Sequence, residues 1–349
     1  MRNHNPANER IKREYFVYLK EAKRQSEASV DAVAAAVARF ETYTHQKDFK
    51  TFHHQQAVAF KQALSREQSS TTGKALSKAT LYATLSHLKR FFQWLAGRPG
   101  YKSRFTYSDA DYFNVSEKDA RIATARRSRP VPTVEQVRHV ISQMPTATDI
   151  DRRNQAVVAF TLLTGARDSA VASAKIKHLE LVSGSFFQDA REVKTKYSKT
   201  FTTTFFPVGD DIRQIVIDWV DFLRREKLWG FDDPLFPKTL TSLGESKQFE
   251  HTRLSREHWS NATPIRAIFK QAFAAAGLPY YHPHSLRHTL AQMGERLCQT
   301  PEQFKAWSQN LGHEGVLTTL FAYGTVPDGR QREIISTLGS RNQPARSIP

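Results

Sequence analysis

Residues 154–166, "NQAVVAFTLLTGA", constrain the fold most, because this segment is apolar on nearly every side. A helix without a polar face must lie buried inside a domain. We therefore expect the C-terminal half of the chain to have a core built around this helix. The same helix would deliver Gly165 and Arg167 to the edge of that core.

The first third of the chain is predicted to be helical. Apolar residues recur at helical spacing within residues 77–97, with Ser77 as a candidate N-cap and Gly97 as a candidate stop. The apolar stripe consists of Leu81, Leu85, Leu88, Phe92 and Leu95. Further helices are predicted through residues 28–44 and 51–67. We interpret residues 1–100 as a small helical domain with a basic exterior.

A basic linker is predicted to follow over residues 101–130. Glycine and proline break the helical pattern near Pro99, and the stretch up to Pro132 mixes turn residues with several arginines. A second domain then begins near Thr133, whose spacing from Gln136 is that of a capping box. Its predicted extent is residues 131–349.

Residues 183–209 differ from the rest of the second domain. They are rich in phenylalanine, valine and threonine, with a polar interruption at Tyr197–Lys199, a pattern typical of a β-hairpin. Helices are predicted to resume at residues 210–227, 263–277 and 300–312. The predicted fold class is therefore mostly α with a small β-hairpin or sheet, in which a helical domain precedes a mixed α/β domain.

The charge of the chain restricts its partners. The formal net charge is +17 and the pI is about 9.9, which favours polyanions, and nucleic acid first. We expect no membrane-spanning helix, because no long uncharged apolar run is present. The N-terminus lacks the features of a secretion signal, and the single cysteine, Cys298, fits a reducing cytosol, so a cytoplasmic protein is expected.

Four polar residues in the second half form a candidate anion pocket. Arg167 and Arg287 would each bind two phosphate oxygens with a planar, permanently charged guanidinium. His284 and His313 could donate hydrogen bonds to the same phosphate or transfer protons. Such a set suits attack at a phosphodiester, where negative charge accumulates on the non-bridging oxygens.

Tyr323 is the candidate nucleophile. Its attack on phosphorus would give a covalent phosphotyrosine, which conserves the bond energy and permits rejoining without ATP. The leaving 5′-oxygen needs a proton, and Lys194, Lys196 and Lys199 compete to supply it. If the hairpin continues through them, strand alternation puts Lys194 and Lys196 on one face, and we favour Lys196, which is nearest the turn.

A metal site is the competing interpretation of the histidines. His282, His284 and His288 cluster, and two of them share a helix face at a spacing that metals use. However, no carboxylate or cysteine lies nearby in the sequence, and Arg287 would repel a cation. We expect neither a metal nor another cofactor.

The order arginine, lysine, His-x-x-Arg, histidine, tyrosine resembles the tyrosine recombinases of the phage integrase family. "TGARDSA" resembles the first arginine box, "HSLRHTLA" the second, and "LGHEGVLTT" the segment of the second histidine. Tyr323 lies ten residues after His313, one more than is usual, which we interpret as an insertion. Which lysine corresponds to the family's catalytic lysine is ambiguous. The "TK" context resembles the family motif at Lys196, whereas the distance to Pro207 resembles the family spacing at Lys199.

The resemblance implies a site-specific recombinase or integrase from a bacterial mobile element, acting near the nucleoid. It implies an N-terminal core-binding domain and a catalytic domain that grip double-stranded DNA from opposite faces. Family members act as tetramers on two DNA sites, in some cases with accessory DNA-bending proteins. Two alternatives remain open from the residues: the nicking and closing chemistry of a type IB topoisomerase, and a DNA-binding relative without catalysis.

Overall fold

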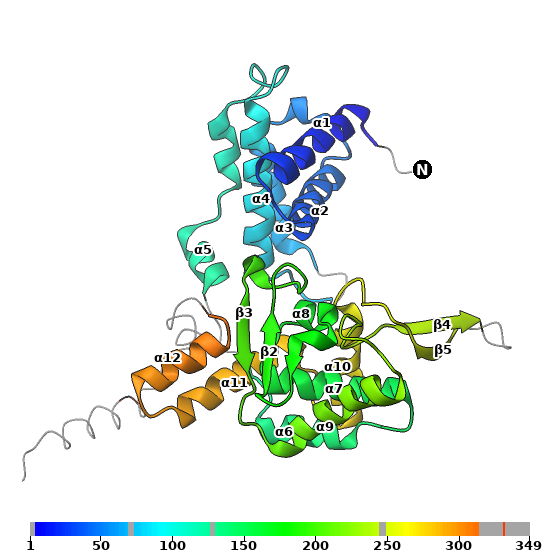
Figure 1. The fold of residues 1–349 in the computed structure, drawn as a ribbon. Helices are drawn as coiled ribbons and strands as arrows, with labels where there is room; N and C mark the ends of the chain where they lie inside the picture. Colours follow the sequence, from blue (N-terminus) through cyan, green and yellow to red (C-terminus); the bar gives the residue numbers. More distant parts are fainter. Residues whose placement is uncertain (1–3, 69–72, 126–129, 244–248, 314–330, 332–349) are drawn as a thin grey trace, which may run out of the picture. The chain divides into compact units, whose positions relative to one another are not determined.

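The computed structural model describes residues 4–68, 73–125, 130–243, 249–313 and 331. Within these residues the chain is mostly helical with two small antiparallel sheets, as predicted (Figure 1). It divides into two compact units, Met1–Arg126 and Arg127–Pro349. No helix in the described part of the chain is long and apolar enough to cross a membrane.

The N-terminal unit is a bundle of helices around one apolar core. Phe40, Phe60, Leu88 and Phe92 lie at its centre with almost no exposed surface. Its elements are α1 (Pro6–Val17), η1 (Tyr18–Ala22), α2 (Glu27–Tyr43), η2 (Phe49–Thr51), α3 (His54–Arg66), α4 (Lys78–Ala96), η3 (Tyr107–Phe113) and α5 (Glu117–Thr124).

Residues 101–125 belong to this unit, whereas the sequence pattern indicates a linker from residue 101 onward. Tyr101, Phe105 and Phe113 are buried in the N-terminal core, and η3 packs against α4. The aromatic side chains hold an irregular segment in place without any helical periodicity that the sequence could reveal. The compact units divide at Arg126, near the end of the predicted linker.

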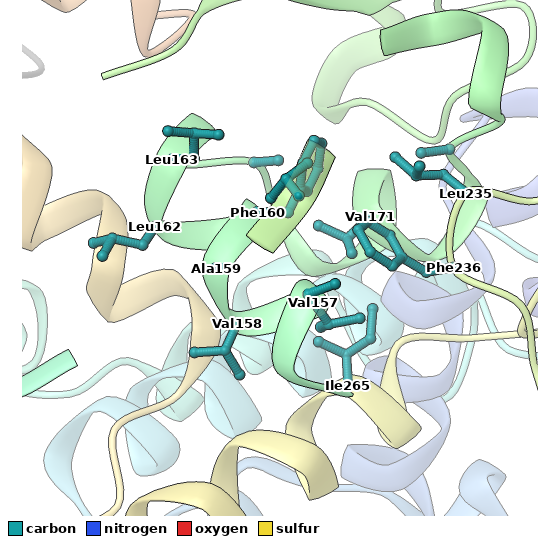
Figure 2. Close-up of a cluster of buried hydrophobic side chains, with 14 of the residues drawn as sticks. Val157, Val158, Ala159, Phe160, Leu162, Leu163, Val171, Leu235, Phe236 and Ile265 are labelled. Atoms are coloured by element: carbon teal, nitrogen blue, oxygen red, sulfur yellow. The ribbon is translucent and has the colours of Figure 1, made fainter. Parts of the chain in front are cut away.

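The second unit is organised around α7, the predicted buried helix. Every residue from Ala156 to Thr164 is buried, and Figure 2 shows the side chains of Val157, Val158 and Leu163 pointing in different directions from it. The helices of this unit are α6 (Val134–Gln143), α7 (Asp149–Thr164), α8 (Asp168–Ser173), η4 (Ile176–His178), η5 (Lys196–Ser198), α9 (Asp210–Asp221), η6 (Phe222–Glu226), α10 (Thr263–Ala275), α11 (Pro283–Leu297) and α12 (Pro301–Asn310).

The larger sheet has three short antiparallel strands in the order β1–β2–β3. They are β1 (Leu179–Glu180), β2 (Ser185–Gln188) and β3 (Phe201–Thr204), with Phe186 opposite Thr203. A second pair, β4 (Thr239–Leu243) and β5 (Phe249–Leu254), forms a hairpin that the sequence analysis missed. Figure 1 shows this hairpin extending away from the helices of its unit.

The strands β2 and β3 are joined by a long loop rather than by a tight turn. Residues 189–200, here called the lysine loop, contain Lys194, Lys196 and Lys199 and only a short 3₁₀ turn. The expectation that strand alternation puts Lys194 and Lys196 on one face is therefore wrong, because neither residue lies in a strand.

Helix boundaries in the second unit follow the predicted capping signals. Thr133 and Thr300 each accept a hydrogen bond from the backbone N–H three residues on, and Gln136 and Gln303 complete the two capping boxes. The cap at Thr300 bears on the functional site, because α12 leads directly to the segment of His313.

Candidate functional site

The end of α7 places the first arginine. Gly165 ends the helix with φ of 59°, a conformation that costs a side-chain-bearing residue energy. Arg167 then becomes the N-cap of α8. A Cβ on Gly165 would lie 2.9 Å from Leu290 Cδ1 and 3.1 Å from Leu311 Cδ2. Only glycine therefore allows this turn to pack against the helices that carry the other site residues.

Arg287 lies on the buried side of α11 and is only 4% exposed. Its Nη1 donates to the Gly165 carbonyl at 2.7 Å, and its Nη2 donates to the Leu311 carbonyl and, at 3.2 Å, to His313 Nε2. Although the segment around Arg287 is rich in polar residues, Leu286 and Leu290 anchor α11 in the core, and Arg287 satisfies backbone carbonyls there.

His313 is positioned by the end of α12. The side chain of Asn310 bonds both backbone groups of Thr204 in β3, its Nδ2 donating to the carbonyl at 2.8 Å and its Oδ1 accepting from the N–H at 2.7 Å. Gly312 follows with φ of 71°, and a Cβ there would lie 2.6 Å from the Phe201 ring. The start of β3 and the turn before His313 are therefore packed tightly together.

Both histidines of the site are held in the neutral form. Desolvation, followed by the charges of Arg287 and Arg167, lowers the pKa of His313 to about 4. Desolvation, followed by Arg287, His288 and Arg167, lowers the pKa of His284 to about 4 as well. Because arginine only donates, His313 Nε2 must accept from Arg287, which leaves the proton of the neutral ring on Nδ1.

The side chain of Arg167 is half-buried. Among the described residues, none forms a hydrogen bond or an ion pair with it, and desolvation lowers its pKa. The neighbouring carboxylate of Asp168 is instead taken by Arg266, whose Nε and Nη2 both lie 2.8 Å from Asp168 Oδ2. Desolvation, followed by the charge of Arg167, lowers the pKa of Arg287 to about 9. Two cations thus share a site that has no counterion within the described residues.

The three candidate lysines have different surroundings. Lys194 Nζ donates to the Ser260 carbonyl at 3.4 Å, and Lys196 Nζ lies 4.7 Å from the centre of the Tyr197 ring. Lys199 makes no hydrogen bond or ion pair with the described residues, and its charge helps to lower the pKa of His313. Lys199 stands two residues before Phe201, the residue packed against Gly312.

Of the six site residues that the sequence predicts, Arg167, His284, Arg287 and His313 lie together. The hydrogen bonds and shared electrostatic effects described above connect all four. Tyr323 lies outside the described residues. His282, His284 and His288 stand close, with ring centroids 6.2 Å and 5.2 Å apart for successive pairs. However, no group of three or more His, Cys, Asp or Glu residues within the described ranges is arranged to hold a metal ion.

Sequence reasoning missed the groups that hold the site in place. These are the backbone carbonyls of Gly165 and Leu311, the amide of Asn310, and the hydroxyls of Ser169 and Ser173 that contact the lysine loop. A carbonyl gives no sequence signal. Ser169 and Ser173 lie two and six residues after Arg167. Their spacing of four residues could have indicated a shared helix face.

Comparison with known proteins identifies the family. Residues 131–328 match the phage integrase family, and residues 13–98 match the phage integrase, N-terminal SAM-like domain. The chain belongs to the phage integrase family. It is a tyrosine recombinase, an enzyme that breaks and rejoins DNA.

Relatives of this recombinase include bacterial XerC proteins. Tyrosine recombinase XerC of Lactobacillus leichmannii is 25% identical over 253 residues, which cover 71% of this chain and 72% of that protein. XerC of Escherichia coli O1:K1 / APEC is 25% identical over 258 residues, which cover 70% of each. These matches extend across most of the recombinase.

Solved structures share the fold. A lambda integrase (75–356) dimer bound to a COC′ core site has a TM-score of 0.61 at 13% identity, covering 92% of this chain and 97% of that one. The Tn1549 transposon integrase in complex with circular intermediate DNA has a TM-score of 0.59 at 13% identity, covering 93% and 98%. At such low identity the likeness concerns the fold alone.

Proposed function

We propose that this recombinase cleaves a DNA strand by attack of Tyr323 Oη on a phosphodiester held by Arg167, Arg287, His284 and His313. A bond forms between the tyrosine oxygen and phosphorus, and the bond from phosphorus to the 5′-oxygen breaks. The product is a 3′-phosphotyrosine and a free 5′-hydroxyl. Attack of a 5′-hydroxyl on the phosphotyrosine reverses the step and rejoins the DNA.

The observation that carries this proposal is the guanidinium of Arg167, which has no hydrogen-bond or ion-pair partner among the described residues, close to the buried guanidinium of Arg287. Two cations without a counterion in the described part of a partly desolvated site repel one another, and an anion removes that cost. A phosphodiester entering the pocket would supply the missing charge. Its transition state carries more negative charge on the non-bridging oxygens and would be bound more tightly still.

The neutral histidines suit the same chemistry. With its proton on Nδ1, His313 can donate one hydrogen bond to a phosphate oxygen without adding a third charge to the pocket. A neutral His284 can donate in the same way or accept the proton of the attacking phenol. The arginines therefore provide the positive charge, and the imidazoles provide hydrogen bonds and proton transfer.

The general acid is a lysine of the lysine loop. Lys196 is the choice from the sequence context, but the surroundings of Lys199 support Lys199 better. Its charge acts on His313, and the packing of Phe201 against Gly312 keeps this end of the loop near the anion pocket. The Lys196 ammonium instead lies over the Tyr197 ring. We therefore propose Lys199 as the donor of a proton to the 5′-oxygen.

The proposed partner is double-stranded DNA carrying two recombination sites, with four copies of the recombinase bound. The net charge of +17 supports binding to DNA, because phosphate contacts supply much of the affinity. Lambda integrase and XerH are both seen on DNA in solved structures with this fold. No metal or cofactor enters the proposed mechanism, since the arginines occupy the role of a cation.

Replacement of Tyr323 tests the proposal. Tyr323→Phe removes only the attacking oxygen, so we expect DNA binding to persist and covalent attachment to disappear. The readout is a protease-sensitive covalent adduct on nicked duplex DNA from the sequences flanking the gene. Tyr107→Phe, which changes an exposed tyrosine of the other unit, is the matched control. An adduct formed by the Tyr323→Phe protein would show that another residue is the nucleophile.

A further inference from the structure

We infer that Ser169 and Ser173 of α8 are positioning residues that hold the lysine loop against the helix beginning at Arg167. The inference rests on the proposed function, because it concerns where the general acid stands relative to the anion pocket. Neither serine contacts the phosphate in this scheme. Their effect on catalysis passes through the backbone of Lys194, to which both hydroxyls are bonded.

The two serines share one face of α8, four residues apart. Ser169 Oγ donates to the Lys194 carbonyl at 3.0 Å, and the Lys194 N–H donates to Ser173 Oγ at 2.8 Å. The hydroxyl proton of Ser173 is already used, because it is donated to the Ser169 carbonyl at 2.9 Å. Ser173 Oγ is therefore fixed as an acceptor toward Lys194, and both backbone groups of that residue are satisfied by a single helix.

The neighbouring residues anchor the loop from a second side. Glu192 Oε1 accepts from Lys175 at 3.0 Å and from Lys177 at 2.9 Å, and Glu192 Oε2 lies 2.8 Å from His178 Nε2. His178 Nδ1 accepts from the Lys175 N–H, so Nε2 carries the proton and donates to Glu192. The hydrogen bonds from Lys177, His178 and Lys175 lower the pKa of Glu192 to about 2.

The distal part of the loop is anchored at its end, where the Ala190 N–H donates to Thr200 Oγ1 at 3.0 Å. Lys196, Tyr197 and Ser198 are exposed, and Tyr197 and Ser198 have φ of 61° and 50°. A turn in which the Ser198 N–H donates to the Thr195 carbonyl at 3.4 Å joins this exposed stretch to the residues before it. Lys199 is therefore held from two sides, by Thr200 and Phe201 after it and through Lys194 before it.

This arrangement connects two functional groups through one short helix. α8 is N-capped by Arg167 and, through its two serines, holds one side of the loop that carries the lysine. α8 thereby sets the distance between the phosphate held by Arg167 and the proton donor from one side of the loop, and β3 sets it from the other. Loss of the serine hydroxyls would misplace the acid and leave the arginines in place, since no hydrogen bond from either serine reaches Arg167.

The test uses DNA in which sulfur replaces the 5′-bridging oxygen at the cleavage site, because a thiolate leaves without protonation. We expect Ser169→Ala and Ser173→Ala to cleave normal DNA at least about tenfold more slowly than the parent protein, as a displaced general acid would. On the sulfur substrate both variants should return to within about twofold of the parent. Ser169→Thr, which keeps a hydroxyl on a half-exposed side chain, should cleave both substrates normally.

Reference variants separate this inference from the proposed function. Lys199→Ala and Lys196→Ala show which lysine is rescued by sulfur. Ser183→Ala, the control, removes a hydroxyl that lies 3.0 Å from the Ser185 hydroxyl, away from the lysine loop. Rescue of a lysine variant without rescue of the serine variants overturns the positioning role alone. Equal slowing of the serine variants on both substrates, or no slowing at all, also overturns it. If no lysine variant is rescued, the general-acid assignment fails instead.

Discussion

At the residue scale, Arg287 shows how a buried charge can be kept without a carboxylate. Its guanidinium is satisfied by two backbone carbonyls and by His313, which are dipoles rather than charges. A carboxylate in their place would neutralise the arginine and weaken its attraction for phosphate. The carbonyls orient the planar group while leaving its positive charge available, which is the condition for preorganised stabilisation of an anionic transition state.

Arg287→Lys should therefore separate cleavage from binding. Lysine keeps the charge but cannot reach two carbonyls and a phosphate with one planar group, so we expect the cleavage rate to fall on the order of 10²-fold or more. DNA affinity should change little. Single-turnover cleavage and equilibrium binding on the same duplex measure the two quantities. Arg225→Lys, at an exposed ion pair with Asp221, serves as the control. A near-normal cleavage rate would contradict the anion pocket.

The two neutral histidines make stability depend on pH. Their folded-state pKa values of about 4 lie below the ordinary value of 6.5, so the unfolded chain binds more protons between these limits. Their contribution to stability is therefore fully present above pH 6.5 and decreases as the pH falls toward 4. His313→Asn should show a weaker loss of stability over this interval. Urea unfolding at a series of pH values measures it, and an unchanged pH dependence would count against the neutral state.

At the element scale, capping signals and apolar periodicity were reliable guides. Thr133, Thr300, the stripe of α4 and the buried α7 were all predictable, because each depends on interactions within one helix or on its burial. The shape of the lysine loop could not be predicted in this way. It depends on contacts with Ser169 and Ser173 of α8 and on the ion pairs of Glu192, a residue of the loop, and neither kind of contact produces a periodic sequence pattern. The hairpin of β4 and β5 was missed because its strand sequences, TLTSL and FEHTRL, are polar at most positions and show no clear apolar alternation.

The cap of α12 should matter for both stability and cleavage. Thr300→Ala removes the side-chain acceptor for the Gln303 N–H, and loss of such a cap costs about 1 kcal/mol. Because α12 ends in the turn that positions His313, we also expect slower cleavage. Urea unfolding and single-turnover cleavage test the two effects, with Thr300→Ser as the variant that keeps the cap. Equal stability of the alanine and serine variants would show that the cap contributes nothing.

At the scale of the whole molecule, the sequence predicted a helical unit followed by a mixed α/β unit. Arg167, His284, Arg287 and His313 were found through their motifs, and the structure brings all four together. What the motifs could not supply was the packing of residues 101–125 into the N-terminal unit. Tyr101, Phe105 and Phe113 carry no periodic pattern, and their burial follows only from the shape of the helices around them.

The charge of the whole chain leads to the last prediction, which concerns salt. Binding of a protein with a net charge of +17 to DNA should release many counterions, so affinity should fall steeply with salt. With six or more phosphate contacts, we expect a loss of roughly 10³-fold between about 50 and 200 mM salt.

Arg167→Gln should reduce the slope of log affinity against log salt by about one, because its guanidinium has no partner in the described part of the chain and is proposed to bind a phosphate. Arg225→Gln, whose guanidinium is already paired with Asp221, should leave the slope unchanged. Titrations of labelled duplex at several salt concentrations give all three slopes. An unaltered slope for Arg167→Gln would mean that this arginine does not contact the phosphate. Another cationic side chain would then have to bind the phosphate in the pocket.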